Sequence, residues 1–235
     1  MKNYFKNLEL LSKNHVYSPE MEHDACGVGL IASTEGKKSR SVVEHGIEAL
    51  KAVWHRGAVD ADGKTGDGAG IHLEIPKDFF IEKIQVTGHQ HDDSEICVGM
   101  IFLPRNDYSS QESCKTIVES ALTKNNFSIY GWRQVPVNTK VLGVKALQTM
   151  PEIIQVLFKS NDPNLLNKEL ERKIYEIRKK IENDAHKLSL NNFYICSMSS
   201  KSIIYKGMFL AESISEFFLD LKDQRFVSRY AIFHQ

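Results

Sequence analysis

The chain has 235 residues, of which 42% are hydrophobic, so it is long enough to bury the core of one sizeable domain or two small ones. Its 30 basic and 30 acidic side chains cancel, and no run of Lys or Arg forms the basic stripe of a nucleic-acid-binding protein. The first residues lack the apolar core and small-residue cleavage site of a signal peptide, and no segment approaches the about 18 apolar residues of a membrane span. We therefore predict a cytoplasmic protein that binds neither nucleic acid nor a membrane.

In chain order, the pattern predicts first a buried strand at residues 27–33. Residues 41–54 follow with apolar side chains at helical spacing, opened by a capping box from Ser41 to Glu44. Residues 70–76 alternate apolar side chains with His72 and Glu74, which predicts a strand with one wet face. Further strands are expected at residues 96–103, 127–135, 153–158, 193–198, 202–206 and 230–233, and helices at residues 109–123 and 165–186.

The connection between strands 193–198 and 202–206 is too short for a crossover helix, so these strands are expected to pair as an antiparallel hairpin. This favours α+β sheets covered by helices over a parallel Rossmann sheet. Helix 165–186 carries a stripe of Ile174, Ile177 and Ile181. Such a stripe can bind a partner, but core packing is the commoner explanation.

Glycines gather in residues 57–70, between the first helix and the second strand. A P-loop is excluded, because five residues rather than four separate Gly57 from Gly63-Lys64-Thr65. An EF-hand is excluded as well, because Lys64 and Thr65 occupy the third-ligand and glycine positions. Two interpretations remain: a mobile surface loop, or a loop whose backbone N–H groups approach a small ligand.

The four cysteines are far apart, with no Cys-x-x-Cys pair and no histidine placed to complete a zinc site, so they are expected to be reduced thiols. Cys97 and Cys196 lie in apolar runs and are expected to be buried in strands. Cys26 differs, because it follows a small acidic run and precedes a Gly-x-Gly. The question is whether Cys26 is a buried thiol or a nucleophile.

From about Pro19 to Gln235 the chain resembles the glutaminase domain of glutamate synthase large subunits, in the segments DACGVGLIAS, SVVEHGIEALKAVWHRGAVDADGKTGDGAGIH, GWRQVPV and FYICSMSSKSIIYKGMFLA. That domain is a class II glutamine amidotransferase of the N-terminal-nucleophile hydrolase superfamily. The resemblance implies an α+β fold: an αββα sandwich of mainly antiparallel sheets with helices on the outer faces, incomplete at the C-terminus. It also implies a leader or propeptide at residues 1–25, followed by the N-terminal part of the amidotransferase domain at residues 26–235.

The resemblance implies that Cys26 is the catalytic nucleophile and that the Ala25–Cys26 bond is processed. Removal of the leader would free an α-amino group with a pKa of roughly 7.7–8.0, a suitable base for a thiol of pKa about 8.5. Cys26 would attack the side-chain amide of glutamine, release ammonia, and leave a thioester that water converts to glutamate. Arg56 resembles the family arginine that orders the substrate-binding loop around the nucleophile. The alternative is that Arg56 only complements a helix C-terminus, and His55 is expected to be a local hydrogen-bonding residue.

In the complete family enzyme the ammonia reacts with 2-oxoglutarate in later domains that hold FMN and an iron–sulfur cluster, so no cofactor is expected in this segment. The expected partners are L-glutamine, the remaining synthase domains and a small electron-donor subunit. The sequence stops before the family's Arg-[Tyr/Phe]-Ser-Thr-Asn and Asn-Gly-Glu segments, so the piece alone is expected to be weak or inactive. Two alternatives stay open: another N-terminal-nucleophile amide hydrolase, or an inert truncated fragment that only associates with synthase subunits.

Overall fold

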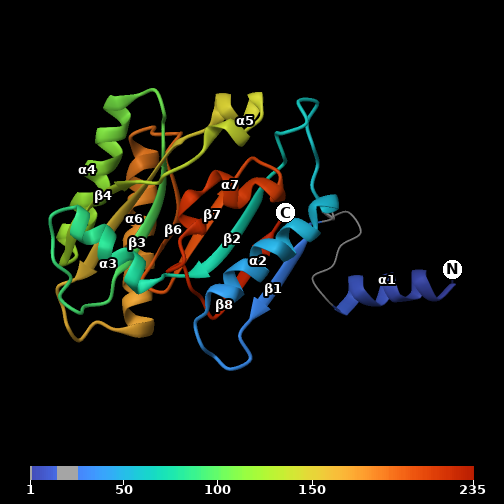
Figure 1. Ribbon diagram of the computed structural model, residues 1–235, viewed down its shortest axis with the longest axis horizontal. Helices are drawn as coiled ribbons and strands as arrows, with labels where there is room; N and C mark the ends of the chain where they lie inside the picture. The colour runs from blue at the N-terminus through green and yellow to red at the C-terminus, as the bar shows by residue number, and fades with distance from the viewer. Residues whose placement is uncertain (1, 15–25) are drawn as a thin grey trace.

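The computed structural model describes residues 2–14 and 26–235. In this part of the chain the strands form two four-stranded sheets in which every pairing is antiparallel (Figure 1). The first sheet has the order β1 (Val28–Ala32), β8 (Tyr230–His234), β2 (Ala69–Glu74), β7 (Ser202–Gly207). The second has the order β4 (Phe127–Gln134), β5 (Glu152–Ser160), β3 (Cys97–Leu103), β6 (Tyr194–Ser199). All the predicted segments therefore form strands, but the prediction that the first one is buried is wrong: β1 has no buried residue, and Val28 and Leu30 are 65% and 61% exposed.

Helices cover one face of each sheet. The helices are α1 (Lys2–Asn14), α2 (Arg40–Ala52), α3 (Lys77–Val86), α4 (Tyr108–Lys124), α5 (Val144–Thr149), α6 (Asn167–Lys187) and α7 (Ile214–Phe217). Short 3-10 turns are η1 (Trp54–Arg56), η2 (Thr139–Val141), η3 (Ala211–Ser213) and η4 (Leu219–Lys222). α2 lies on the first sheet, and α4 and α6 enclose a core with the second (Figure 1). The predicted fold of mainly antiparallel sheets with outer helices is confirmed.

The predicted hairpin of β6 and β7 is wrong. β6 pairs with β3 in the second sheet, whereas β7 pairs with β2 in the first. The carboxylate of Glu171 in α6 accepts hydrogen bonds from Ser200 N (2.7 Å), Ser200 Oγ (2.7 Å) and Ser199 Oγ (2.8 Å). The polar groups of the short connection therefore find their partner in a side chain, and the chain passes from one sheet to the other without forming a ladder.

The helix predicted at residues 41–54 begins earlier and is capped differently. Ser39 is the N-cap of α2, and its hydroxyl accepts a hydrogen bond from the Val42 amide at 3.4 Å. Glu44 does not close a capping box with Ser41, because its carboxylate accepts a hydrogen bond from Arg40 Nε at 2.9 Å. An ion pair one turn apart has thus replaced the predicted cap.

The predicted wet face of β2 is also wrong in part. His72 is half-buried, and Glu74 is only 6% exposed. Glu74 accepts hydrogen bonds from the Arg229 guanidinium, at 2.6 Å and 2.9 Å, and from the Arg229 amide at 2.6 Å. A paired carboxylate can be buried at a position that the alternating pattern assigned to solvent.

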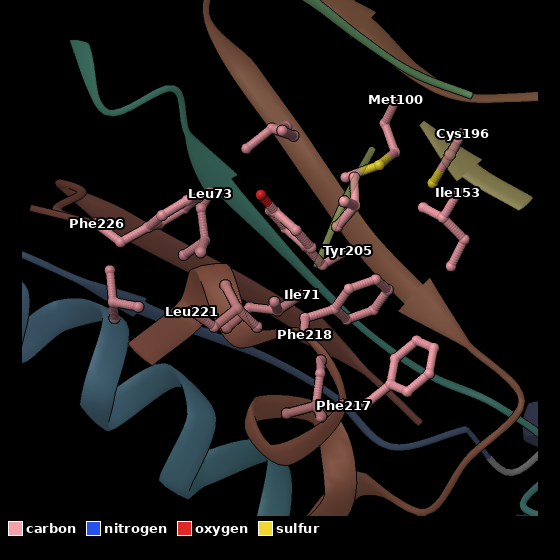
Figure 2. Packing of buried hydrophobic residues seen from close by; sticks show 14 of the residues in the cluster. Ile71, Leu73, Met100, Ile153, Cys196, Tyr205, Phe217, Phe218, Leu221 and Phe226 are labelled. Carbon is pink, nitrogen blue, oxygen red and sulfur yellow. The ribbon is translucent and has the colours of Figure 1, made fainter. Parts of the chain in front are cut away.

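The buried residues form two cores, and the larger one joins the two sheets. Ile71, Leu73 and Tyr205 of the first sheet lie near Met100 and Ile153 of the second (Figure 2). Phe217, Phe218, Leu221 and Phe226 from the segment after β7 pack against the same cluster (Figure 2). The segment between β7 and β8 therefore contributes to the core that both sheets share.

The stripe on α6 belongs to the second core, because Ile174, Ile177 and Ile181 are at most 1% exposed. The helices α1, α3, α5 and α7 were not predicted. Among the described residues, no helix combines the length and the apolarity that a bilayer crossing needs. The predicted leader consists of α1 together with residues that lie outside the described part, and Ala25 of the predicted cleavage site is one of these.

Candidate functional site

Cys26 is exposed and lies two residues before β1. The Gly27 amide donates to the Gln235 carbonyl at 2.7 Å, and the Gln235 amide donates back to Gly27 at 2.8 Å. This pair extends the antiparallel ladder of β1 and β8 by one step beyond Val28 and His234. The backbone beside the candidate nucleophile is therefore fixed at the end of the first sheet.

Arg56 comes from a different element but reaches the same place. It ends η1, the short turn that follows α2. A Cβ atom added to Gly27 would lie 3.1 Å from both Cβ and Cγ of Arg56 and 3.3 Å from Cβ of Val53. The glycine after Cys26 thus lets the stem of the Arg56 side chain pack against the backbone. The two residues singled out in the sequence are neighbours through Gly27.

Gln235 is a third member of this site that the sequence did not reveal. Its Nε2 donates to the carbonyl of Trp54 at 3.4 Å, and a Cβ atom on Gly57 would lie only 2.0 Å from that nitrogen. Its Oε1 is buried and has no hydrogen-bond partner among the described residues. Sequence patterns carry no signal for this contact, because 181 positions separate Gln235 from Trp54.

The glycine-rich loop after Arg56 is closed by its own backbone. Val59 and Gly66 form an antiparallel bridge, and the Asp67 amide donates to the Ala58 carbonyl at 3.3 Å. Within the loop, Asp60 N donates to Thr65 O at 2.9 Å. The loop also contacts α5: the Ala146 amide donates a hydrogen bond to Thr65 Oγ1 at 3.4 Å, and Lys145 forms an ion pair with Asp60 at 2.5 Å.

An open cavity of about 570 Å³ lies near this end of the first sheet. His72, Ile204 and Ile232 of the first sheet line it together with Phe102 and Tyr194 of the second. Burial lowers the pKa of His72 from its ordinary value, which favours the neutral imidazole. Neither Cys26 nor Arg56 is among the lining residues.

The other three cysteines are buried, as predicted for Cys97 and Cys196. Burial raises the pKa of Cys114 and of Cys196 to about 11 and raises that of Cys97 further, so these thiols stay protonated at neutral pH. Within residues 2–14 and 26–235, no group of three or more His, Cys, Asp or Glu side chains is placed to hold a metal ion. Cys26 alone combines exposure with a position at a strand end.

Comparison with known proteins identifies the family of the chain. A family model described as "Glutamine amidotransferases class-II" matches residues 26–235. The chain is 53% identical over 229 residues to a "Glutamate synthase [NADPH] large chain" from Azospirillum brasilense, which covers 97% of this chain and 15% of that protein. It is 37% identical to a "Ferredoxin-dependent glutamate synthase 2" from Synechocystis, covering 91% of this chain and 13% of the relative. A "Glutamate synthase [NADPH] large chain" from Bacillus subtilis is 35% identical, over 93% of this chain and 14% of the relative.

The chain thus spans only about a seventh of the length of these curated relatives. The family match begins at Cys26, the exposed cysteine beside Gly27 and Arg56. It continues through both sheets to Gln235. The chain belongs to the class II glutamine amidotransferases.

Proposed function

We propose that this chain performs the glutaminase half-reaction of glutamate synthase, with L-glutamine as the substrate and Cys26 as the nucleophile. The observation that carries the proposal is the position of Cys26. It is the first residue of the family match and the exposed cysteine of the chain, whereas the other three are buried. A nucleophile must be accessible to its substrate, and the form of cysteine that attacks is the thiolate, which burial disfavours.

In the proposed mechanism, removal of the residues before Cys26 frees its α-amino group. That amine takes the thiol proton, and Sγ attacks the side-chain amide carbon of glutamine. The tetrahedral intermediate collapses to a γ-glutamyl thioester as the C–N bond breaks, and the proton leaves with ammonia. Water then hydrolyses the thioester to glutamate and restores the thiol.

Arg56 orders the substrate-binding loop in this proposal. Its stem already contacts Gly27, and Gly57 beside it packs against Gln235. The alternative function at a helix C-terminus is compatible with the same position, because Arg56 ends the turn that follows α2. A substitution that keeps the charge separates these roles: the Arg56→Lys variant retains a cation for the helix end but loses the planar guanidinium.

The remaining partners are proposed for the longer enzyme. Ammonia would pass to 2-oxoglutarate in other domains, which would hold FMN and an iron–sulfur cluster and receive electrons from a small subunit. The donor set in the described part of this chain does not fit an iron–sulfur cluster, because its cysteines are far apart and three are buried. A cytoplasmic location stays a prediction from the sequence.

We expect the glutaminase activity of the chain by itself to be weak. The face of the first sheet opposite α2 exposes Val28 (65%), Leu30 (61%) and Ile232 (39%). Apolar strand residues in such a row are usually covered by another layer of the fold. The whole enzyme is therefore the better preparation for turnover, and the chain alone is suited to labelling of the nucleophile.

The first experiment is intact-mass analysis before and after exposure to a glutamine analogue that alkylates thiols. We expect loss of residues 1–25 and one adduct on Cys26, with no adduct in the Cys26→Ser variant. The Cys196→Ser variant is the matched control and should keep the adduct. Labelling of any other cysteine in the folded protein, or glutaminase activity of the whole enzyme that survives Cys26→Ser, would overturn the proposal.

A further inference from the structure

The glycine-rich loop is organised around one carboxylate. Asp62 Oδ1 accepts hydrogen bonds from the amides of Lys64 (2.9 Å) and Thr65 (2.7 Å), and its Oδ2 accepts one from the Thr65 hydroxyl (2.6 Å). These hydrogen bonds hold the pKa of Asp62 well below its usual range, and the one from the Thr65 hydroxyl has the largest effect. The carboxylate is therefore charged at neutral pH and stays an acceptor for all three donors.

The same two residues dock the loop on α5. Thr65 is only 3% exposed, and its Oγ1 accepts a hydrogen bond from the Ala146 amide at 3.4 Å. A Cβ atom on Gly143, the residue before α5, would lie 2.2 Å from Thr65 Oγ1 and 2.3 Å from Asp62 Oδ2. Lys145 adds an ion pair to Asp60 at 2.5 Å. Gly143 thus leaves just enough room for the loop to dock.

This docking point lies in the segment that continues directly from the site. The chain runs from Arg56 and Gly57 to Val59, which forms an antiparallel bridge with Gly66. Gly66 directly follows Thr65. Gly66 is itself confined, because a Cβ atom there would lie 2.6 Å from the carbonyl oxygen of Phe209. The loop is therefore attached at its far end to α5 and at its base to the chain after β7. A shift at Thr65 would be transmitted along a short closed segment to Gly57.

We propose that Asp62 and Thr65 are positioning residues for the glutaminase reaction: docked on Gly143 and α5, they hold residues 57–66 so that the stem of Arg56 stays packed against Gly27, the residue next to Cys26. The inference rests on the proposed function of Cys26 and Arg56, and it adds two residues and one helix that the reaction needs. Neither Asp62 nor Thr65 contacts the nucleophile in this arrangement. Their effect passes through the loop backbone to Arg56.

The docking itself is tested by trypsin cleavage after the exposed Lys64, followed by mass spectrometry on the full chain. Thr65→Val keeps the shape of the side chain but removes two hydrogen bonds of about 0.5–1.5 kcal/mol each, so cleavage should become about fivefold to 150-fold faster. Thr65→Ser keeps the hydroxyl and should cleave at close to the wild-type rate. Gly143→Ala changes a residue outside the loop and should also accelerate cleavage. The backbone angles of Gly143, φ −76° and ψ 168°, are allowed for alanine, so the substitution acts only through the clash of the new Cβ with Thr65 and Asp62.

Val144→Ala is the matched control for Gly143→Ala. Val144 is the first residue of α5 and its side chain is 62% exposed, so the substitution should leave the cleavage rate unchanged. Equal cleavage rates in wild type, Thr65→Val and Gly143→Ala would overturn the docking. Thermal unfolding of each variant excludes global destabilisation as the cause of faster cleavage.

The positioning role is tested by alkylation of Cys26 with a charged and a neutral reagent. The proposal puts the Arg56 guanidinium near the Cys26 thiol, where it would favour anionic iodoacetate, so the ratio of the iodoacetate rate to the iodoacetamide rate tests this position of Arg56. Arg56→Gln gives the ratio without this cation. We expect Thr65→Val and Gly143→Ala to fall toward that value, and Thr65→Ser and Val144→Ala to keep the wild-type ratio.

If the loop variants are cleaved faster but keep the wild-type alkylation ratio, the positioning role is wrong. Both measurements need no turnover, so they remain decisive even if the glutaminase assay refutes the function of Cys26. In the whole enzyme, Thr65→Val should lower kcat/KM, and Thr65→Ser should restore it. A kcat/KM that Thr65→Val leaves unchanged would also overturn the proposal.

Discussion

Replacement of Asp220 by alanine should be among the most destabilising single changes in this chain. Asp220 in η4 accepts two hydrogen bonds from the Arg133 guanidinium of β4, at 2.8 Å and 2.5 Å. Arg133 also donates to Gln155 Oε1 at 2.7 Å, and the Tyr205 hydroxyl donates to Asp220 at 3.0 Å. The network joins β4 and β5 of the second sheet to β7 of the first. It fixes how the two sheets meet.

The magnitude follows from burial. The side chains of Arg133 and Asp220 are 12% and 3% exposed, so removal of the carboxylate leaves a buried guanidinium without its counter-ion, with only Gln155 Oε1 as an acceptor, and a buried Tyr205 hydroxyl without its acceptor. Breaking such a pair costs about 3–5 kcal/mol. For a chain of this size each kcal/mol lowers Tm by about 2–4 °C, so Asp220→Ala should lower Tm by roughly 6–20 °C.

The assay is thermal unfolding followed by circular dichroism, with Glu216→Ala as the control. Glu216 pairs with Lys222 at 2.7 Å, but these side chains are 53% and 47% exposed, so its loss should change Tm little. In an Arg133→Met background, Asp220→Ala should cost much less, because the guanidinium is already gone. An Asp220→Ala variant that melts no lower than Glu216→Ala would refute the reasoning.

Three further outcomes are expected. Gly46→Ala should lower Tm, because the new Cβ would lie 2.4 Å from the Cβ of Ala231. The cost of overpacking, about 1–3 kcal/mol, exceeds the roughly 1 kcal/mol gained in helix propensity. An unchanged or raised Tm would contradict the packing of α2. Burial raises the pKa of Glu74, but hydrogen bonds from Arg229 outweigh it and hold the pKa below its ordinary value. The ionised Glu74 therefore stabilises the folded state fully above the unfolded-state pKa of about 4.3, and this stabilisation is lost as pH falls through the lower folded-state pKa. The Tm of Glu74→Gln should therefore fall less steeply in acid than the Tm of the wild type. Iodoacetamide should modify Cys26 alone in the folded chain and all four cysteines in denaturant; two or more adducts under native conditions would contradict the burial of the others.

Much of the secondary structure could be predicted because its signals are local. The strands and the helices α2, α4 and α6 follow from the spacing of apolar residues, which each short segment carries by itself. α3 gave no such signal, because Phe79 and Phe80 are adjacent apolar residues rather than members of a clear helical stripe. The N-cap of α2 was misassigned for a related reason: Ser39 and Ser41 are both suitable caps, and the ion pair of Arg40 with Glu44 decides between them.

The arrangement of these elements could not be predicted in the same way. The short link between β6 and β7 is compatible with a hairpin, but the two strands pair in different sheets, and Glu171, about 30 positions earlier, accepts the hydrogen bonds of Ser199 and Ser200 in the link. The alternation in β2 assigned Glu74 to solvent, whereas Arg229 from the other end of the chain allows its burial. Both outcomes depend on partners that a segment does not contain.

The sequence by itself determined the family, the strands and Cys26 as the candidate nucleophile, because these depend on residue types in a fixed local order. Tertiary structure alone decided that the stem of Arg56 packs on Gly27 next to Cys26, that Gln235 packs on Gly57, and that the glycine-rich loop docks on α5. Each of these contacts joins residues far apart in the chain. Such partners are selected by the fit of their shapes and by their hydrogen bonds in the folded protein. The spacing of residues along the sequence does not encode either property.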